Sequence, residues 1–228
     1  MRDRRPWELA RSLLELQDLL IEEPGLFEER TPPLDTPWSD VPLAFLDVET
    51  TGLHADRGDR IVEIAILRRA PGRGEDRYVE IFDPERPIPE AVRKIHAIRD
   101  SQVNRARKFE AAIPPIMDLL SGAVWVGHNL AFDIRFVRME MMRTGRRLPP
   151  GWILDTHALS RRILTLPRCT LAAVADHLGH GGRNLHQALD DILTTREVLD
   201  SLVMRLEPRP ERLADVLEAM VSRPPQGG

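Results

Sequence analysis

Three strand-like segments between Val41 and Phe82 constrain the fold more than any other part of the chain. The first is an apolar run from Val41 to Leu46, and the second, from Arg60 to Arg69, is rich in isoleucine and valine. The third, from Tyr78 to Phe82, alternates apolar with polar residues. Pro71-Gly72-Arg73-Gly74 predicts a turn between the last two. Because both connections are short, we predict that the three strands are antiparallel neighbours.

Strands alternate with helices in the rest of the chain. We predict helices over residues 89–95, 109–120, 130–143, 155–164, 171–178 and 186–206, and short strands over residues 123–126 and 152–154. Strands followed by alternating strands and helices indicate an α/β domain with a mixed sheet, over residues 41–206. Residues 1–40 are predicted to form a helix and a proline-rich linker, and residues 207–228 a short helix and a disordered tail.

Composition limits the class of protein. The 228 residues are 42% apolar and 30% charged, as expected for one soluble globular domain with extensions. A net charge of -4 gives no support to tight nonspecific nucleic-acid binding, although acidic metal ligands in a nuclease would offset basic residues. The single Cys169 excludes an internal disulfide and fits the cytoplasm. No apolar run is long enough for a membrane span, and no secretory signal is apparent.

Asp47 and Glu49 directly follow the first apolar run. Side chains two positions apart on a strand point to the same face, about 7 Å apart along the chain. Two desolvated anions repel each other, and no lysine or arginine lies between Val41 and Ala55 to neutralise them. A divalent metal ion could do so. The alternative is a solvated strand end at the turn Thr50-Thr51-Gly52.

Further acidic residues stand at predicted helix starts. Asp133 lies in the first turn of a helix that follows Gly127-His128-Asn129, and Asp191 lies shortly after His186. Taken alone, each acid could be present only because a negative charge near a helix N-terminus interacts favourably with the helix dipole. His186 alone could be a helix-capping residue. The ordered set of four carboxylates makes these separate explanations improbable. Oxygen ligands suit Mg²⁺ or Mn²⁺ rather than Zn²⁺.

The four carboxylates Asp47, Glu49, Asp133 and Asp191, together with His186, resemble the DEDDh (DnaQ-like) branch of the 3′–5′ exonuclease superfamily. This branch includes the proofreading epsilon subunit of bacterial DNA polymerase III. The resemblance covers residues 43–199 and is carried by four segments: Asp47-Val48-Glu49-Thr50-Thr51-Gly52-Leu53, Asp59 to Ala65, Gly127-His128-Asn129 with Asp133, and His186 to Asp191. It implies a ribonuclease-H-like fold whose five-stranded mixed sheet has an antiparallel second strand.

The resemblance also implies a mechanism. Asp47, Glu49, Asp133 and Asp191 would hold two Mg²⁺ or Mn²⁺ ions that clamp an in-line displacement at phosphorus. His186 would act as the general base on the attacking water. The product would be a 5′-mononucleotide released from a 3′ end. Asp190, beside Asp191, is expected to be a solvated neighbour.

Family positions that contact substrate match several further residues. Thr50, Thr51 and Gly52 would approach the terminal nucleotide, Leu53 would wedge against a base, His96 would lie near the terminal sugar, and Asn129 would order the loop beside Asp133. His96 could instead be a solvated residue at a helix end, because the family's following glycine is Ala97 here. Phe132 is expected in the core rather than stacked on a base, and Asp155 is expected to cap a helix.

The expected substrate is the 3′ end of single-stranded DNA, in proofreading or repair, since the sequence Asp-x-Glu-Thr-Thr-Gly-Leu favours DNA. RNA 3′-end trimming is the alternative within this class. A catalytically silent assembly module is the alternative outside it, and the intact acidic set argues against that. A sliding-clamp partner is unsupported, because Gln17-Asp18-Leu19-Leu20 lacks the aromatic end of a clamp-binding peptide. A polymerase partner is unsupported as well, because the predicted N-terminal helix and short tail differ from the epsilon subunit, whose longer C-terminal segment binds the polymerase.

Overall fold

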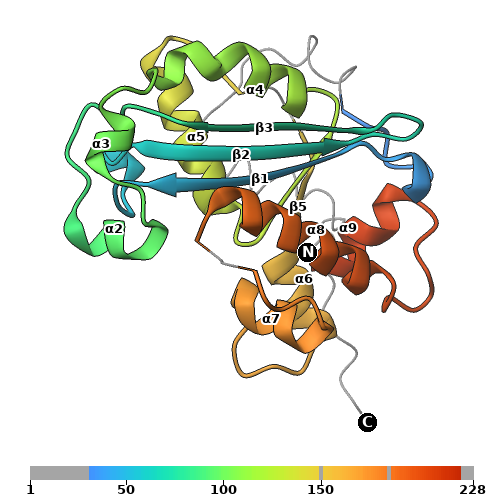
Figure 1. Ribbon diagram of the computed structural model, residues 1–228. Coiled ribbons are helices and arrows are strands. Elements are labelled where there is room, and N and C mark those ends of the chain that lie inside the picture. Colours follow the sequence, from blue (N-terminus) through green and yellow to red (C-terminus); the bar gives the residue numbers. More distant parts are fainter. Residues whose placement is uncertain (1–30, 149–150, 184–185, 222–228) are drawn as a thin grey trace, which may run out of the picture.

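A mixed five-stranded sheet lies at the centre of the protein (Figure 1). The computed structural model describes residues 31–148, 151–183 and 186–221, so the helix and tail predicted at the two ends of the chain lie largely outside the described residues. The strands are β1 (Leu43–Thr50), β2 (Ile61–Arg69), β3 (Glu75–Ile81), β4 (Val124–Gly127) and β5 (Ile153–Asp155), in the order β3-β2-β1-β4-β5.

Strand β2 is the one that runs against the others. It pairs antiparallel with both β1 and β3, whereas β4 is parallel to β1 and β5 is parallel to β4. The predicted mixed sheet with an antiparallel second strand is therefore confirmed. β1 extends to Thr50, four residues beyond the apolar run, because pairing with β2 continues through Asp47, opposite Ala65, and Glu49, opposite Glu63. The register shifts between Glu49 and Thr50, where the strand turns into the loop.

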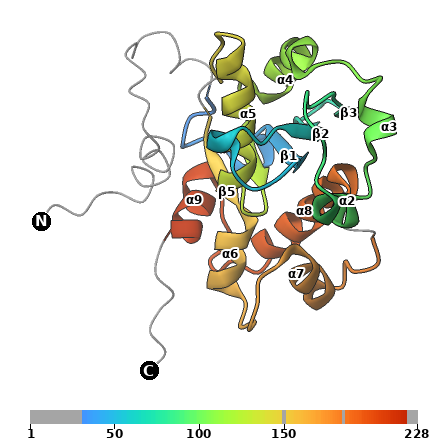
Figure 2. The same ribbon diagram turned by 90° about the vertical axis from the view of Figure 1, so that its left-hand side faces the viewer.

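Helices cover both faces of the sheet (Figures 1 and 2). One face packs against α4 (Ile113–Leu120) and α5 (Ala131–Arg143). The other packs against α6 (Thr156–Ile163), α8 (Ala188–Val203) and α9 (Leu213–Val221), with α7 (Leu171–Leu178) beside α8. Two short helices, α2 (Glu90–His96) and α3 (Asp100–Val103), lie beyond the end of β1 (Figure 1).

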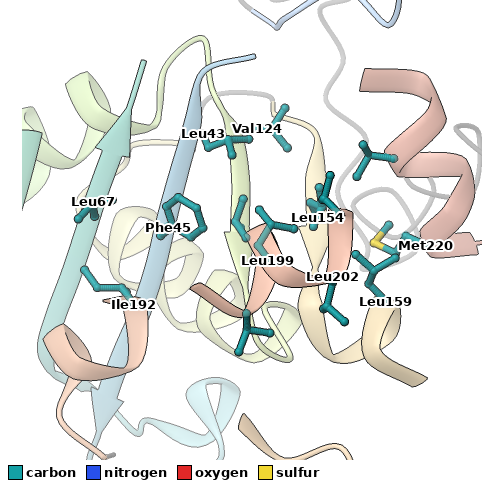
Figure 3. Packing of buried hydrophobic residues seen from close by; sticks show 14 of the residues in the cluster. Leu43, Phe45, Leu67, Val124, Leu154, Leu159, Ile192, Leu199, Leu202 and Met220 are labelled. Carbon is teal, nitrogen blue, oxygen red and sulfur yellow. The ribbon is translucent and has the colours of Figure 1, made fainter. Parts of the chain in front are cut away.

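The two faces of the sheet carry the two larger clusters of the core, and a third, smaller cluster comprises Val62, Ile88, Ile98 and Val103. Phe45 on β1 and Leu67 on β2 point toward α8, where Ile192, Leu199 and Leu202 are buried (Figure 3). Leu46, one residue after Phe45, belongs to the cluster under α4 and α5. This alternation follows from the two-residue period of a strand, and it explains why β1 is apolar on both sides.

Local sequence signals explain most helix boundaries. Asp155 accepts hydrogen bonds from the backbone N–H groups of His157 and Ala158 at the start of α6, so the predicted cap is confirmed. Thr170 likewise accepts one from Ala173 at the start of α7. The helix predicted from Phe109 begins only at Ile113, after a 3₁₀ turn over Phe109–Ala112, because Pro114 and Pro115 fit only in the first turn of a helix.

The start of the last long helix was also predicted wrongly, and this start matters for the site. The last long helix begins at Ala188 rather than at His186. His186 has a positive φ of 75°, which no helical residue can adopt, and Gln187 is extended. His186 is therefore the end of a loop, and its relation to Asp191 does not follow from helical spacing.

The segments on either side of the domain pack together. The Trp38 N–H donates to the Glu211 carbonyl, and the Leu213 N–H donates to the Thr36 carbonyl. The apolar face of α9 is buried through Leu213, Val216, Leu217 and Met220. Within the described ranges of the chain, no helix has the length and apolar character needed to cross a membrane.

Candidate active site

Three of the predicted metal ligands meet on the face of the sheet that α8 covers. Asp47 and Glu49 lie on β1, and Asp191 lies in the first turn of α8. One carboxylate oxygen from each lies within 4.8 Å of the other two. A strand and a helix that are about 140 residues apart in sequence thus converge, because α8 packs across β1 and β2.

Asp133 lies beside this group rather than in it. It stands in the first turn of α5, its side chain is 4% exposed, and its Oδ1 accepts a hydrogen bond of 3.0 Å from the Val48 backbone N–H. Val48 separates Asp47 from Glu49, so this bond ties α5 to the acidic end of β1. The charge of Asp133 nevertheless reaches Asp47, whose pKa it raises.

Burial and mutual repulsion raise the pKa values of these acids. Burial is the main cause for Asp47, followed by the charges of Asp133, Asp191 and Glu49. The pKa of Glu49 rises to about 8 through burial and the charges of Asp191 and Glu63. Burial raises the pKa of Asp191 to about 6. In the described part of the chain, no lysine or arginine forms an ion pair with these residues.

Such a group fits divalent metal ions. All three converging ligand atoms are carboxylate oxygens, which suit hard ions such as Mg²⁺ and Mn²⁺, and a dipositive charge would relieve the repulsion that raises the pKa values. Asp133 would join by a rearrangement of its side chain, whose Oδ1 accepts the Val48 N–H.

Without metal, stability should fall as the pH rises. The pKa of Glu49 is about 8 in the folded protein against an ordinary 4.5, so the folded state binds the proton more tightly. The stabilisation is present in full below pH 4.5 and is lost as the pH rises to about 8. Since one pKa unit corresponds to about 1.4 kcal/mol, the loss should be a few kcal/mol.

Urea denaturation in the presence of EDTA, compared at about pH 5 and about pH 8, measures this change. Glu49→Gln is the control, because an amide cannot ionise, and it should flatten the pH dependence. A wild-type stability that increases over this range, or an equal slope in Glu49→Gln, contradicts the predicted repulsion.

Glu63 is a fifth acid at the site, and it was not among the predicted ligands. It stands opposite Glu49 on β2, and its Oε2 accepts a hydrogen bond of 3.3 Å from the N–H of Ala188, the first residue of α8. The available signal was a single carboxylate between Val62 and Ile64 in an otherwise buried strand. Its role is to fix the start of α8 against the sheet.

His186 approaches the group through its backbone. Its N–H lies 3.3 Å from each carboxylate oxygen of Asp191, and its side chain is exposed. His186 and Asp191 are close because the loop that leads into α8 brings His186 to the first turn of the helix. They do not share one face of the helix, since His186 is not part of it. Asp190 lies outside the carboxylate group, and its carbonyl accepts a hydrogen bond from the Thr194 hydroxyl.

The loop after β1 is held by its own hydroxyl groups. The Thr50 hydroxyl donates to the Gly52 carbonyl at 2.6 Å, and the Thr51 hydroxyl contacts Asp59 Oδ1 at 3.3 Å. A Cβ on Gly52 would lie 2.3 Å from the Asp59 carboxylate, so glycine is required there. Leu53, at 71% exposure, is the one apolar side chain of this loop that projects into solvent.

His96 and Asn129 are placed by local backbone geometry. His96 is only 3% exposed, its Nδ1 accepts from the Ile98 N–H, and its ring lies beside the backbone of Thr50, so the alternative of a solvated residue was wrong. Asn129 is exposed with φ 69°, and its N–H donates to Asp155. Phe132 packs against Phe136 at 4.9 Å between ring centroids, as expected for the core.

Ala97 adopts a conformation that suits glycine. It ends α2 with φ 60°, a left-handed conformation that costs an L-residue about 1 kcal/mol. Ala97→Gly should therefore raise the free energy of unfolding by about 1 kcal/mol, measured by urea denaturation. Ala172→Gly, on the exposed side of α7, is the matched control and should lower it by about the same amount. Equal losses in both variants contradict the proposed strain.

The acidic residues and the histidine of the site lie within the part of the chain that matches a known enzyme family. Residues 44–199, more than two thirds of the chain, match the sequence profile of the exonuclease family. The chain belongs to this family. Residues 44–199 form its 3′–5′ exonuclease domain, and the predicted resemblance to DnaQ-like exonucleases is confirmed.

Relatives carry this domain as a part of longer proteins. A DNA polymerase III of the PolC type from Clostridium perfringens is 32% identical over 154 residues, which are 67% of this chain and 10% of that protein. A DNA polymerase III subunit epsilon-like protein from Rhodobacter capsulatus is 31% identical over 77% of this chain and 25% of its own length. The 3′-5′ exonuclease DinG of Bacillus subtilis is 36% identical over 51% of this chain and 12% of its own length.

Solved structures agree in fold. Exonuclease X in complex with 5′ overhanging duplex DNA superposes with a TM-score of 0.60 and 26% identity, over 77% of this chain and 99% of that one. Escherichia coli exonuclease I in complex with a dT13 oligonucleotide superposes with a TM-score of 0.64 over 75% of this chain and 42% of that one, but at 18% identity it shows likeness of fold alone. The predicted ribonuclease-H-like fold is confirmed.

Proposed function

We propose that the protein removes 5′-mononucleotides from the 3′ ends of single-stranded DNA with the help of two Mg²⁺ or Mn²⁺ ions. The observation that carries the proposal is the convergence of Asp47, Glu49 and Asp191 within 4.8 Å, with no lysine or arginine pairing with them among the described residues. The same group argues against a catalytically silent assembly module, which has no need to keep repelling carboxylates together.

Each residue then has a definite task. Asp47, Glu49 and Asp191, with Asp133 beside them, would hold the ions, which when bound supply charge stabilisation at the scissile phosphate and a more acidic water. His186 would take the proton from the attacking water, because its imidazole is exposed and its backbone lies at the edge of the acidic group.

The loop after β1 would receive the terminal nucleotide. Leu53 projects an apolar surface on which a base can rest, and Gly52 lets the backbone approach closely. His96 would support this loop from beneath, since it is buried beside Thr50, and Asn129 would order the backbone next to Asp133. The likeness to an exonuclease X structure with bound DNA and to DNA polymerase III chains supports DNA as the substrate.

The test compares matched single-stranded DNA and RNA oligonucleotides labelled at the 5′ end. With Mn²⁺ or Mg²⁺ we expect stepwise shortening of the DNA from its 3′ end and release of 5′-mononucleotides, and none with EDTA. An oligonucleotide blocked by a 3′ phosphorothioate is the control for polarity. Faster shortening of the RNA would favour 3′-end trimming of RNA, and no release from either polymer would refute the proposal.

A further inference from the structure

The loop that delivers His186 is rich in glycine. Gly179, Gly181 and Gly182 occupy three of four consecutive positions, and Gly179 and Gly182 have φ values of 83° and 105°. Gly181 approaches the Asp176 carboxylate closely, since a Cβ on it would lie 2.1 Å from Asp176 Oδ1. Glycine loses more conformational freedom on ordering than any other residue. A general base such as His186 at the end of such a loop needs side-chain contacts with the rest of the domain to keep a fixed position.

Two anchors connect this loop to α8. Arg183 makes a bidentate ion pair with Glu197, with Nη1–Oε2 and Nη2–Oε1 distances of 2.6 Å. His180 Nε2 lies 2.7 Å from the Ser201 hydroxyl. Glu197 and Ser201 are one turn apart, so both anchors lie on the same side of the helix. We call the Arg183–Glu197 pair the clasp.

The clasp joins the loop to the helix that also carries a metal ligand. Asp191 lies six residues before Glu197 on α8, and Arg183 lies three residues before His186. Hydrogen bonds from Arg183 lower the pKa of Glu197, so the carboxylate is ionised at neutral pH. A movement of α8 would therefore carry Asp191 and the end of the glycine loop together.

We propose that Arg183 and Glu197 are positioning residues that hold the His186 imidazole at the metal-binding group. This inference rests on the proposed function of His186 as the base. The alternative is an ordinary surface ion pair. Since the side chains are 29% and 27% exposed, such a pair contributes little to stability, whereas a displacement of about 1 Å in a catalytic group lowers the rate by up to about 100-fold.

The test is a double-mutant cycle of Arg183→Gln, Glu197→Gln and the two together, assayed on single-stranded DNA with Mn²⁺. We expect each single change to lower kcat by about 10- to 100-fold, with KM and the Mn²⁺ affinity from calorimetry changed less than about twofold. Glu197 also lies 3.8 Å from His180 and 3.7 Å from Arg196, so Glu197→Gln should be the slower single variant. The double variant should be little slower than Glu197→Gln, because Arg183→Gln then removes a pair that is already broken.

Asp200→Asn is the matched control. It breaks the bidentate pair of Asp200 with Arg69, with N–O distances of 3.0 and 2.9 Å, which joins α8 to β2 instead of to the loop. It should leave kcat unchanged. Unchanged kcat in the clasp variants, multiplied losses in the double variant, or a parallel loss of Mn²⁺ binding would overturn the clasp. An inactive wild-type protein, by contrast, would refute the proposed function itself.

Discussion

Asp47→Asn is expected to lower the rate of hydrolysis by about 10³-fold or more and, at the same time, to stabilise the metal-free protein. Asp47 lies at the centre of the acidic group, since the charges of Asp133, Asp191 and Glu49 all raise its pKa. A metal ion supplies several kcal/mol of charge stabilisation in the transition state, and each 1.36 kcal/mol changes the rate about tenfold. Without the ion, ionised Asp47 is instead a buried charge among like charges.

Two measurements on one pair of proteins check this prediction. The rate on single-stranded DNA with Mn²⁺ should fall in Asp47→Asn, while the Tm in EDTA at about pH 8 should rise above that of the wild type. Asp118→Asn, an exposed acid on α4, is the control and should change neither quantity. A wild-type rate in Asp47→Asn contradicts the metal assignment, and a lower Tm contradicts the repulsion.

The lower rate and the higher Tm expected of Asp47→Asn have one structural origin. The Val48 N–H that binds Asp133 and the Ala188 N–H that binds Glu63 each fix one acid at the group. Neither bond supplies a positive charge that would balance the acids. The fold therefore brings carboxylates together at a cost in stability that a bound cation would offset, as is common where local strain serves function.

The sequence was sufficient for features that depend on local patterns. The two-residue period of β1 placed Asp47 and Glu49 on one face, and Thr170 and Asp155 marked helix starts correctly. The antiparallel pairing of the first three strands also followed, because their connections are short.

Other features depend on contacts between segments far apart in the sequence. Glu63 has a role only because α8 begins above it, 125 residues later in the chain. His186 fits an extension of the helical pattern of α8, yet it has a positive φ, and the helix begins only at Ala188. Burial of His96 depends on how α2 packs against Thr50, which no local pattern records.

Removal of the His186 imidazole is the second large effect that we expect. His186→Ala and His186→Asn should each lower kcat by about 10²–10⁴-fold, which is the usual contribution of a general base. Mn²⁺ affinity should persist, because the group of three ligand atoms comes from Asp47, Glu49 and Asp191, and the backbone N–H at position 186 can still bind Asp191.

The two substitutions separate catalysis from backbone strain. At φ 75°, histidine and asparagine tolerate the left-handed conformation better than alanine does, so His186→Asn should keep the wild-type Tm more closely. Equal losses of kcat in both variants therefore identify the imidazole as the cause. Because the side chain at this position is exposed, added imidazole should restore part of the rate. A wild-type rate in His186→Asn would instead assign proton transfer to another group and leave the clasp without a base to position.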